Sequence, residues 1–318
     1  MLALALASIC AALMGFAIQR GGTCLVAAVD EVVSKQRATR LLALAEGSAL
    51  VAAGMVVAQL LHVLPMAPGA FALTGWTVAG GMIMGLGAYV AGACVFGAVA
   101  RIGNGDAAYF FVPAGFFLGC LTALELGMAR LPHRVPAHSL VLNQPLIFVG
   151  PLLLLVGWRI WQMLHAARRR ELLAHLWSPH VATSVIGATF VILVLVAGPW
   201  SYTEYLADTA RHMARNGATR GMLLVALFAG ALLGGWTGGR IKSVRVSIAA
   251  LARCLAGGIL LGLGGSLVPG ANDGLILLGL PLLYPHAWLA VASMVLAIAT
   301  ALVLQQRLTA MVRKPRLA

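Results

Sequence analysis

The chain has 318 residues and a mass of 33.0 kDa; 61% of its residues are hydrophobic, 10% are charged, and its net charge is +13. Soluble globular chains are about 45–50% apolar even when glycine is counted, so this composition excludes a soluble fold, and the scarcity of charge excludes a disordered one. Five Cys, an odd and sparse number, do not make a disulfide scaffold. We therefore predict an all-α polytopic membrane protein whose positive charge lies in its loops.

Nine apolar runs are each long enough to cross the hydrocarbon core of a bilayer, which takes about 20 helical residues. We expect transmembrane helices near residues 1–19, 41–61, 72–100, 107–129, 146–165, 181–199, 221–239, 254–280 and 287–305. No basic residue precedes the first run, so it is predicted to be a retained helix rather than a signal peptide.

Lys and Arg fall mainly in alternate connections between these helices. Seventeen of the 22 lie within residues 20–40, 101, 159–170, 240–253 and 307–316, and five lie in the other connections: Arg130, Arg134, Arg211, Arg215 and Arg220. Because cytoplasmic loops carry the excess of Lys and Arg, this predicts a cytoplasmic C-terminus, with residues 306–318 as a basic tail. The run Arg168-Arg169-Arg170 beside a transmembrane helix indicates a cytoplasmic flank, so no nucleic-acid partner is expected.

An internal repeat joins the third and eighth of these runs. Residues 80–94 read GGMIMGLGAYVAGAC and residues 257–271 read GGILLGLGGSLVPGA. Aligned without a gap, Gly80, Gly81, Gly85 and Gly87 fall on Gly257, Gly258, Gly262 and Gly264, and Cys94 falls on Ala271. Spans five apart run in opposite directions, so one transmembrane domain made of two inverted halves, about 1–165 and 181–305, is predicted, with Gly-rich broken helices at the midplane. The alternative is that both segments are small-residue faces for helix packing.

Three segments carry a resemblance to a known family: GFAIQRGGTC at 15–24, GLGAYVAGACVFG at 85–97 and GLGGSLVPGANDG at 262–274. They resemble the signature segments of the YeeE/YedE sulfur-transport family of bacterial inner-membrane proteins. The resemblance implies uptake of thiosulfate through a path between two inverted halves, along which Cys residues hand the ion onward. Cys24 and Cys94 match two of the motif cysteines, whereas the third motif position is Ala271, so the chain is an atypical member.

Thiol chemistry suits such a path. A thiol is a weak hydrogen-bond donor and a polarizable acceptor, so it can hold a soft sulfur anion and still release it, as passage through a pore requires. For Cys24 and Cys94 a place on the path and a role as buried packing thiols both stay open. Cys10, Cys120 and Cys254 lie in ordinary apolar runs and are predicted to be packing residues.

The predicted substrate path also includes the residues around these cysteines: Gln19, Arg20, Gly92, Gly270, Asn272 and Asp273. Arg20 either extends to the membrane interface or attracts the anion. Asp273 either binds a proton or cation or caps the half-helix that follows it. Glu46 and Glu125 fall within spans and are expected to be paired or to face a cavity.

Other chemistry has little support in the sequence. The eight His form no metal-binding pattern, and no CxxC, HExxH or CxxCH motif occurs, so we expect no metal and no cofactor. Asp30 and Glu31 are predicted to lie on a solvated loop that balances Lys35 and Arg37 rather than to act in acid–base catalysis. The protein is therefore not expected to be an enzyme.

Three functions remain open. The first is a transporter that moves thiosulfate or a related sulfur anion past Cys24 and Cys94. The second is a membrane partner that passes persulfide sulfur from Cys24 to a cytoplasmic sulfur carrier or sulfurtransferase. The third is a structural subunit without a pore.

Overall fold

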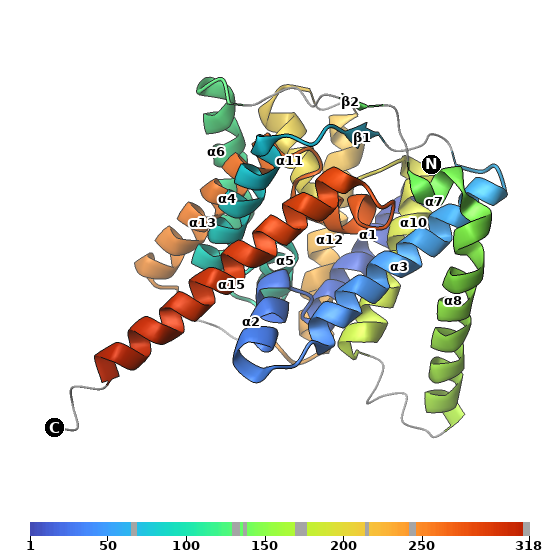
Figure 1. The fold of residues 1–318 in the computed structure, drawn as a ribbon, viewed down its shortest axis with the longest axis horizontal. Helices are drawn as coiled ribbons and strands as arrows, with labels where there is room; N and C mark the ends of the chain where they lie inside the picture. The colour runs from blue at the N-terminus through green and yellow to red at the C-terminus, as the bar shows by residue number, and fades with distance from the viewer. Residues whose placement is uncertain are drawn as a thin grey trace.

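The computed structural model describes residues 1–64, 69–128, 134–135, 139–168, 177–213, 216–241 and 246–313. Nine helical segments within these ranges are long and apolar enough to cross a membrane, and each overlaps one of the predicted spans. The described chain is helical apart from one short strand pair (Figure 1). The prediction of an all-α polytopic membrane protein is confirmed.

The first part of the chain contains eight elements up to residue 125 and a short strand in the connection that follows. They are α1 (Leu2–Gly21), α2 (Leu25–Lys35), α3 (Thr39–Leu60), β1 (Ala70–Phe71), α4 (Gly75–Ala91), α5 (Val95–Gly103), the 3-10 turn η1 (Ala107–Phe110) and α6 (Phe111–Glu125), and then β2 (Arg134–Val135). Ala70 pairs with Val135 and Phe71 with Arg134, so β1 and β2 are antiparallel. This ribbon joins the connection before α4 to the connection after α6.

The second part begins with α7 (Leu140–Asn143) and α8 (Pro145–Arg168). It continues with α10 (Pro179–Ala197), α11 (Tyr202–Ala210), α12 (Gly217–Thr237), α13 (Ile248–Leu267), α14 (Ala271–Gly274), the π-helical turn η2 (Leu275–Gly279) and α15 (Pro285–Arg313). Serine side chains cap four of these helices, because Ser139, Ser178, Ser201 and Ser247 accept hydrogen bonds from backbone N–H groups three residues ahead.

Two sequence expectations change at this level. Asp30 and Glu31 lie on helix α2 rather than on a loop, and Glu31 accepts a hydrogen bond from Arg40 N at 3.1 Å. Helix α15 continues to Arg313, so most of the expected basic tail is helical. Eight of the basic residues used to predict orientation lie outside the described residues: Arg130, Arg169, Arg170, Arg215, Lys242, Arg245, Lys314 and Arg316.

The repeated glycines bring α4 and α13 into direct contact. A Cβ on Gly80 would lie 2.8 Å from the Gly264 carbonyl oxygen, and a Cβ on Gly264 would lie 2.6 Å from the Gly80 oxygen. Gly87 and Gly257 face each other in the same reciprocal way, at 2.7 and 2.6 Å. The two helices are therefore antiparallel, and their glycines form a small-residue packing face as well as a repeat. Reciprocal contacts between equivalent residues are what a two-fold relation requires.

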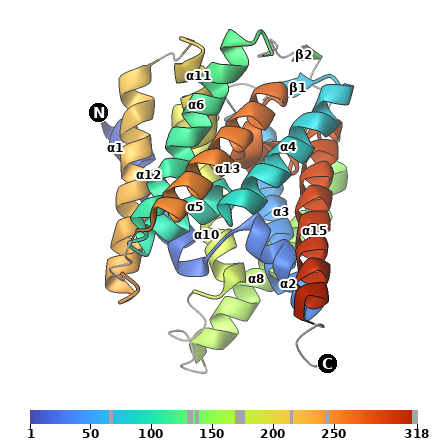
Figure 2. The same ribbon diagram turned by 90° about the vertical axis from the view of Figure 1, so that its left-hand side faces the viewer.

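The neighbouring helices follow the same relation. Helix α6 packs on α13 as α15 packs on α4, and the four lie in a row in Figure 2. Helix α1 packs on α12 as α3 packs on α10. We infer that the two inverted halves are residues 2–125 and 179–313, with α8 outside both, rather than a first half that extends to residue 165.

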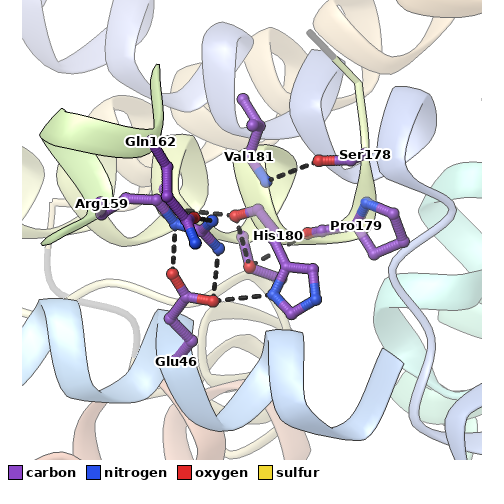
Figure 3. Close-up of polar contacts among 9 residues, drawn as sticks. Glu46, Arg159, Gln162, Ser178, Pro179, His180 and Val181 are labelled. Atoms are coloured by element: carbon purple, nitrogen blue, oxygen red, sulfur yellow. Dashed lines mark hydrogen bonds and ion pairs between the residues drawn. The ribbon is translucent and has the colours of Figure 1, made fainter. Parts of the chain in front are cut away.

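Helix α8 stands at the edge of the molecule (Figure 1) and packs mainly against α3. A buried ionic cluster joins it to the bundle: the Glu46 carboxylate on α3 accepts hydrogen bonds from Arg159 on α8, and it lies 2.7 Å from Nδ1 of His180 on α10 (Figure 3). The predicted pairing of Glu46 is confirmed. Glu125 instead lies exposed at the end of α6.

Candidate functional site

Two of the motif cysteines meet in the interior. Cys24 and Cys94 stand at the N-cap positions of α2 and α5, and their side chains are hydrogen-bonded to each other. The Leu25 backbone N–H donates to Cys94 Sγ at 3.2 Å. A Cβ on Gly97 would lie only 2.5 Å from Cys24 Sγ, so the absence of a side chain there leaves room for the thiol. Segments 70 residues apart therefore form one buried thiol pair.

The chain reaches this arrangement by breaking two helices at glycines. Gly22 ends α1 with φ 58° and Gly92 ends α4 with φ 72°, a conformation that favours glycine. The third motif segment breaks in the same way, at Gly270 with φ 92°. Ala271 follows it, and its methyl group lies beside Gly265 on α13. No thiol accompanies the pair from this third segment.

The two polar residues at the end of α1 are used in helix packing. Gln19 is buried, and its Nε2 donates to Asn104 Oδ1 at 2.8 Å. The guanidinium of Arg20 lies 5.5 Å from the centre of the Phe16 ring and 5.6 Å from that of Trp177, which is cation–π geometry. Both side chains thus have protein partners beside the path.

Arg40 is a basic side chain in direct contact with the cysteine segment. Its Nη1 donates to the Gly22 carbonyl oxygen at 3.3 Å, and it lines a cavity of about 10 Å³ together with Cys24. A second cavity of about 20 Å³ shares Thr23 with the first and reaches Phe96 and Ile276. These spaces hold about one water each, so passage of a polyatomic anion requires the surrounding helices to move. Sequence reasoning counted Arg40 only as an orientation signal.

Asp273 is buried beside helix α11. Its Oδ2 accepts from the Thr203 backbone N–H at 3.3 Å, and its Oδ1 accepts from the Thr203 hydroxyl and from Gly274 N at 3.1 Å. The carboxylate therefore caps the start of α11, which comes earlier in the chain, and not a half-helix that follows it. The neighbouring Asn272 is fully buried, and both polar atoms of its side chain lack a hydrogen-bond partner.

Helix α11 connects the two groups. The Tyr202 hydroxyl donates to the carbonyl oxygen of Val95, the residue after Cys94, at 2.9 Å, while the next residue, Thr203, holds Asp273. Cys24, Cys94 and Asp273 are thus gathered at one place by the starts of short helices. The sequence analysis missed α11, although Ser201 and Glu204 have the spacing of a helix start.

The geometry defines a helical membrane protein with a buried pair of thiols at the starts of two short helices. The family described as sulphur transport matches residues 20–300, so the chain belongs to the sulphur transport family. The thiosulfate transporter TsuA of Escherichia coli (strain K12) is 25% identical over 329 residues, which cover 92% of each chain. The protein is a transporter of a sulfur anion.

Proposed function

We propose that this protein is a permease of the bacterial inner membrane that carries thiosulfate, or a closely related sulfur oxyanion, past Cys24 and Cys94 without catalysing a covalent reaction. The observation that carries the proposal is the thiol pair at the starts of α2 and α5. The name of the Escherichia coli relative, a thiosulfate transporter, supports the substrate.

The surroundings of the pair suit a soft anion. Thiols donate weak hydrogen bonds to sulfur and oxygen, so the anion is held without being trapped. The starts of α2 and α5 contribute the positive end of each helix dipole, and Arg40 adds a full charge at the small cavity that Cys24 lines. Gly92 and Gly270 break the helices next to this region and let backbone approach the path.

The distribution of Lys and Arg supports a cytoplasmic C-terminus. In that orientation the connection from α2 to α3 with Arg37, and the start of α3 with Arg40, face the cytoplasm, and the end of α11 with Arg211 faces outward. The path then runs from the side of Asp273 toward the side of Arg40.

Uptake of labelled thiosulfate into proteoliposomes tests the proposal. We expect Cys24→Ala and Cys94→Ala each to abolish most of the uptake. Cys10→Ala and Cys254→Ala are matched controls, because these thiols are equally buried but lie in helix interiors, and they should leave uptake near the wild-type rate. A wild-type protein that takes up no sulfur oxyanion would contradict the proposal.

The transfer of persulfide sulfur to a cytoplasmic carrier is less well supported. Cys24 is only 8% exposed and Cys94 is fully buried, so neither thiol is open to a protein partner in this conformation. Mass spectrometry of the protein from cells fed thiosulfate would show a persulfide on Cys24 if this alternative held.

A further inference from the structure

We propose that Asp273 is a proton-binding site and that its protonation is coupled to occupancy of the Cys24–Cys94 pair, so that the protein is a proton–anion symporter. This inference rests on the transport function proposed above. It adds the driving force, which the similarity to other transporters does not name.

Asp273 is buried and, among the described residues, has no cation beside it, unlike three other carboxylates that each pair with an Arg. Glu46 pairs with Arg159, Glu31 with Arg40 and Asp208 with Arg220. In the described part of the chain no Lys, Arg or His lies within ion-pair distance of Asp273, which is 2% exposed. A buried carboxylate without a counter-ion is costly when charged, and binding a proton removes that cost.

The immediate contacts fit a proton better than a metal ion. Both carboxylate oxygens already accept hydrogen bonds from N–H or O–H groups, with the Ser201 hydroxyl as a further partner, and a metal ion cannot replace these donors without breaking them. Across the residues that the structure describes, no three His, Cys, Asp or Glu side chains gather as metal ligands. A neutral carboxyl group keeps the oxygens as acceptors and gains one O–H donor.

The adjacent Asn272 gives a second, independent indication that this place is built for a bound group. Its side chain is 0% exposed, yet neither its amide nitrogen nor its oxygen has a hydrogen-bond partner. Unsatisfied buried polar atoms cost about 1–3 kcal/mol each, so they persist where a ligand or its water completes them. A free amide donor next to a proton-binding carboxyl suits an oxyanion that arrives together with a proton.

Electrostatics supplies the coupling. An anion at the thiol pair and a charged Asp273 repel each other, since both are negative. The two are close because the first turn of α11 is hydrogen-bonded both to the Asp273 carboxylate and to the backbone next to Cys94. Proton binding removes the repulsion, and by linkage anion binding raises the affinity for the proton by the same factor. Uptake of the anion then takes up a proton with it.

The charged and titratable groups around Asp273 are few. Helix α11 presents Tyr202 and Glu204, and at its far end Arg211, whose Nη2 donates to the Ser266 carbonyl oxygen on α13 at 3.5 Å. Helix α5 presents Cys94 at its start, and η2 presents aliphatic side chains. Burial raises the pKa of Glu204 to about 7, and the nearby Asp208 carboxylate adds to the shift. Glu204 can therefore exchange protons near neutral pH, between the end of α11 and Asp273.

The test uses proteoliposomes with the membrane potential clamped by potassium and valinomycin and a pH dye inside. With one proton per anion, a gradient of one pH unit, acid outside, drives at most about tenfold accumulation of thiosulfate. We expect the lumen to acidify as thiosulfate enters and a protonophore to abolish the accumulation. Uptake by the wild type without proton movement would overturn this inference and leave the proposed function intact, whereas no uptake at all would remove both.

Variants assign the effect to Asp273. In Asp273→Asn uptake should continue only down the concentration gradient and without acidification, while Asp273→Glu should keep the proton coupling. Asp106→Asn is a matched control that removes a carboxylate outside this site and should behave as wild type. Proton coupling that survives in a folded Asp273→Asn protein would overturn the assignment. If that variant does not fold, Asp273→Ala takes its place: lost coupling in folded Asp273→Ala protein supports the assignment, and unchanged coupling overturns it.

Discussion

At the scale of single residues, the absence of a side chain at Gly97 makes room for the thiol of Cys24. A Cβ at position 97 would collide with Cys24 Sγ, at 2.5 Å. Overpacking of a filled interior costs about 1–3 kcal/mol, so Gly97→Ala should displace the thiol and lower uptake by about tenfold. Gly75→Ala makes the same chemical change where no atom lies within 4 Å, and it should leave uptake unchanged. Initial rates in proteoliposomes measure both variants. Wild-type uptake by a folded Gly97→Ala protein would show that the position of Cys24 is unimportant.

Arg40 is the residue whose role the structure changes most. Its side chain is 43% exposed, so solvent screens its charge and its contribution to anion binding is modest, about 0.2–1 kcal/mol. Arg40→Gln should raise KM for the anion about two- to fivefold, less at high salt, with little change in kcat. Arg37→Gln removes the same charge from an exposed position in the connection between α2 and α3 and serves as the control. Equal effects of the two substitutions would indicate a general surface potential instead of a local contact.

The sequence indicated a functional role for some of these residues and not for others. Cys24, Cys94 and Asp273 stood out because thiols and a carboxylate are unusual within Gly-rich apolar segments. Their meeting could not be predicted, because it depends on contacts between segments 70 residues apart. Arg40 was hidden among the many basic residues that set orientation. The partners of Gln19 and Arg20 were unpredictable for the same reason, since Asn104 and Trp177 come from distant segments of the chain.

At the scale of elements, helix α8 is held by its ionic cluster. The side chains of Arg159 and Glu46 are 12% and 11% exposed, and removing one partner of such a buried pair costs about 3–5 kcal/mol because the other charge stays behind. Arg159→Leu alone should therefore lower the melting temperature markedly. Adding Glu46→Gln should recover part of the loss, since no buried charge is then left unpaired. A double-mutant cycle of thermal unfolding in detergent measures the coupling.

Uptake gives the control for this cluster. Because α8 lies outside both inferred halves and packs mainly on α3, folded Arg159→Leu protein should transport at nearly the wild-type rate. A loss of uptake without a loss of stability would mean that α8 belongs to the transport path. Additive effects of the two substitutions on stability would instead show that the pair contributes nothing as a unit.

Long helices could be predicted from the sequence, whereas short helices could not. Long apolar runs predicted all nine spans, because only a helix satisfies its own backbone in lipid. The short helices α2, α11 and α14 were missed, since 11, 9 and 4 residues are too few to form a spanning pattern. These short helices position the thiols and Asp273, so the part of the fold that the sequence predicts least is the part that forms the site.

At the scale of the whole molecule, the two inverted halves carry different chemistry at matching places. In the first half the start of α2 faces the thiol of Cys94, and in the second half the start of α11 faces the carboxylate of Asp273. The reciprocal glycine contacts of α4 and α13 keep the halves related by one axis. Cys94 aligns with Ala271, and Asp273 lies two residues further on, so neighbouring places in the two motif segments are proposed as a subsite for a soft anion and a subsite for a proton.

The direction of transport depends on whether Asp273 or the thiol pair lies on the outer side of the path. The excess of Lys and Arg predicts that the α2–α3 connection and the end of α15 lie in the cytoplasm and that the end of α11 lies outside. Protons from the outside would then reach Glu204 and Asp273 before the thiol pair. If each of the nine candidate segments in the described residues crosses the membrane once, Leu2 and Arg313 lie on opposite sides of it.

A matched pair of methionines tests this orientation in the full-length protein. Met213 follows α11 and is 55% exposed, and Met311 lies near the end of α15 and is 66% exposed, while all five native cysteines are buried. In spheroplasts, a membrane-impermeant maleimide should label Met213→Cys directly and Met311→Cys only after the membrane is permeabilised. The reverse pattern would invert the molecule and place Asp273 on the cytoplasmic side of the thiols, so that protons would meet the thiol pair first on entry.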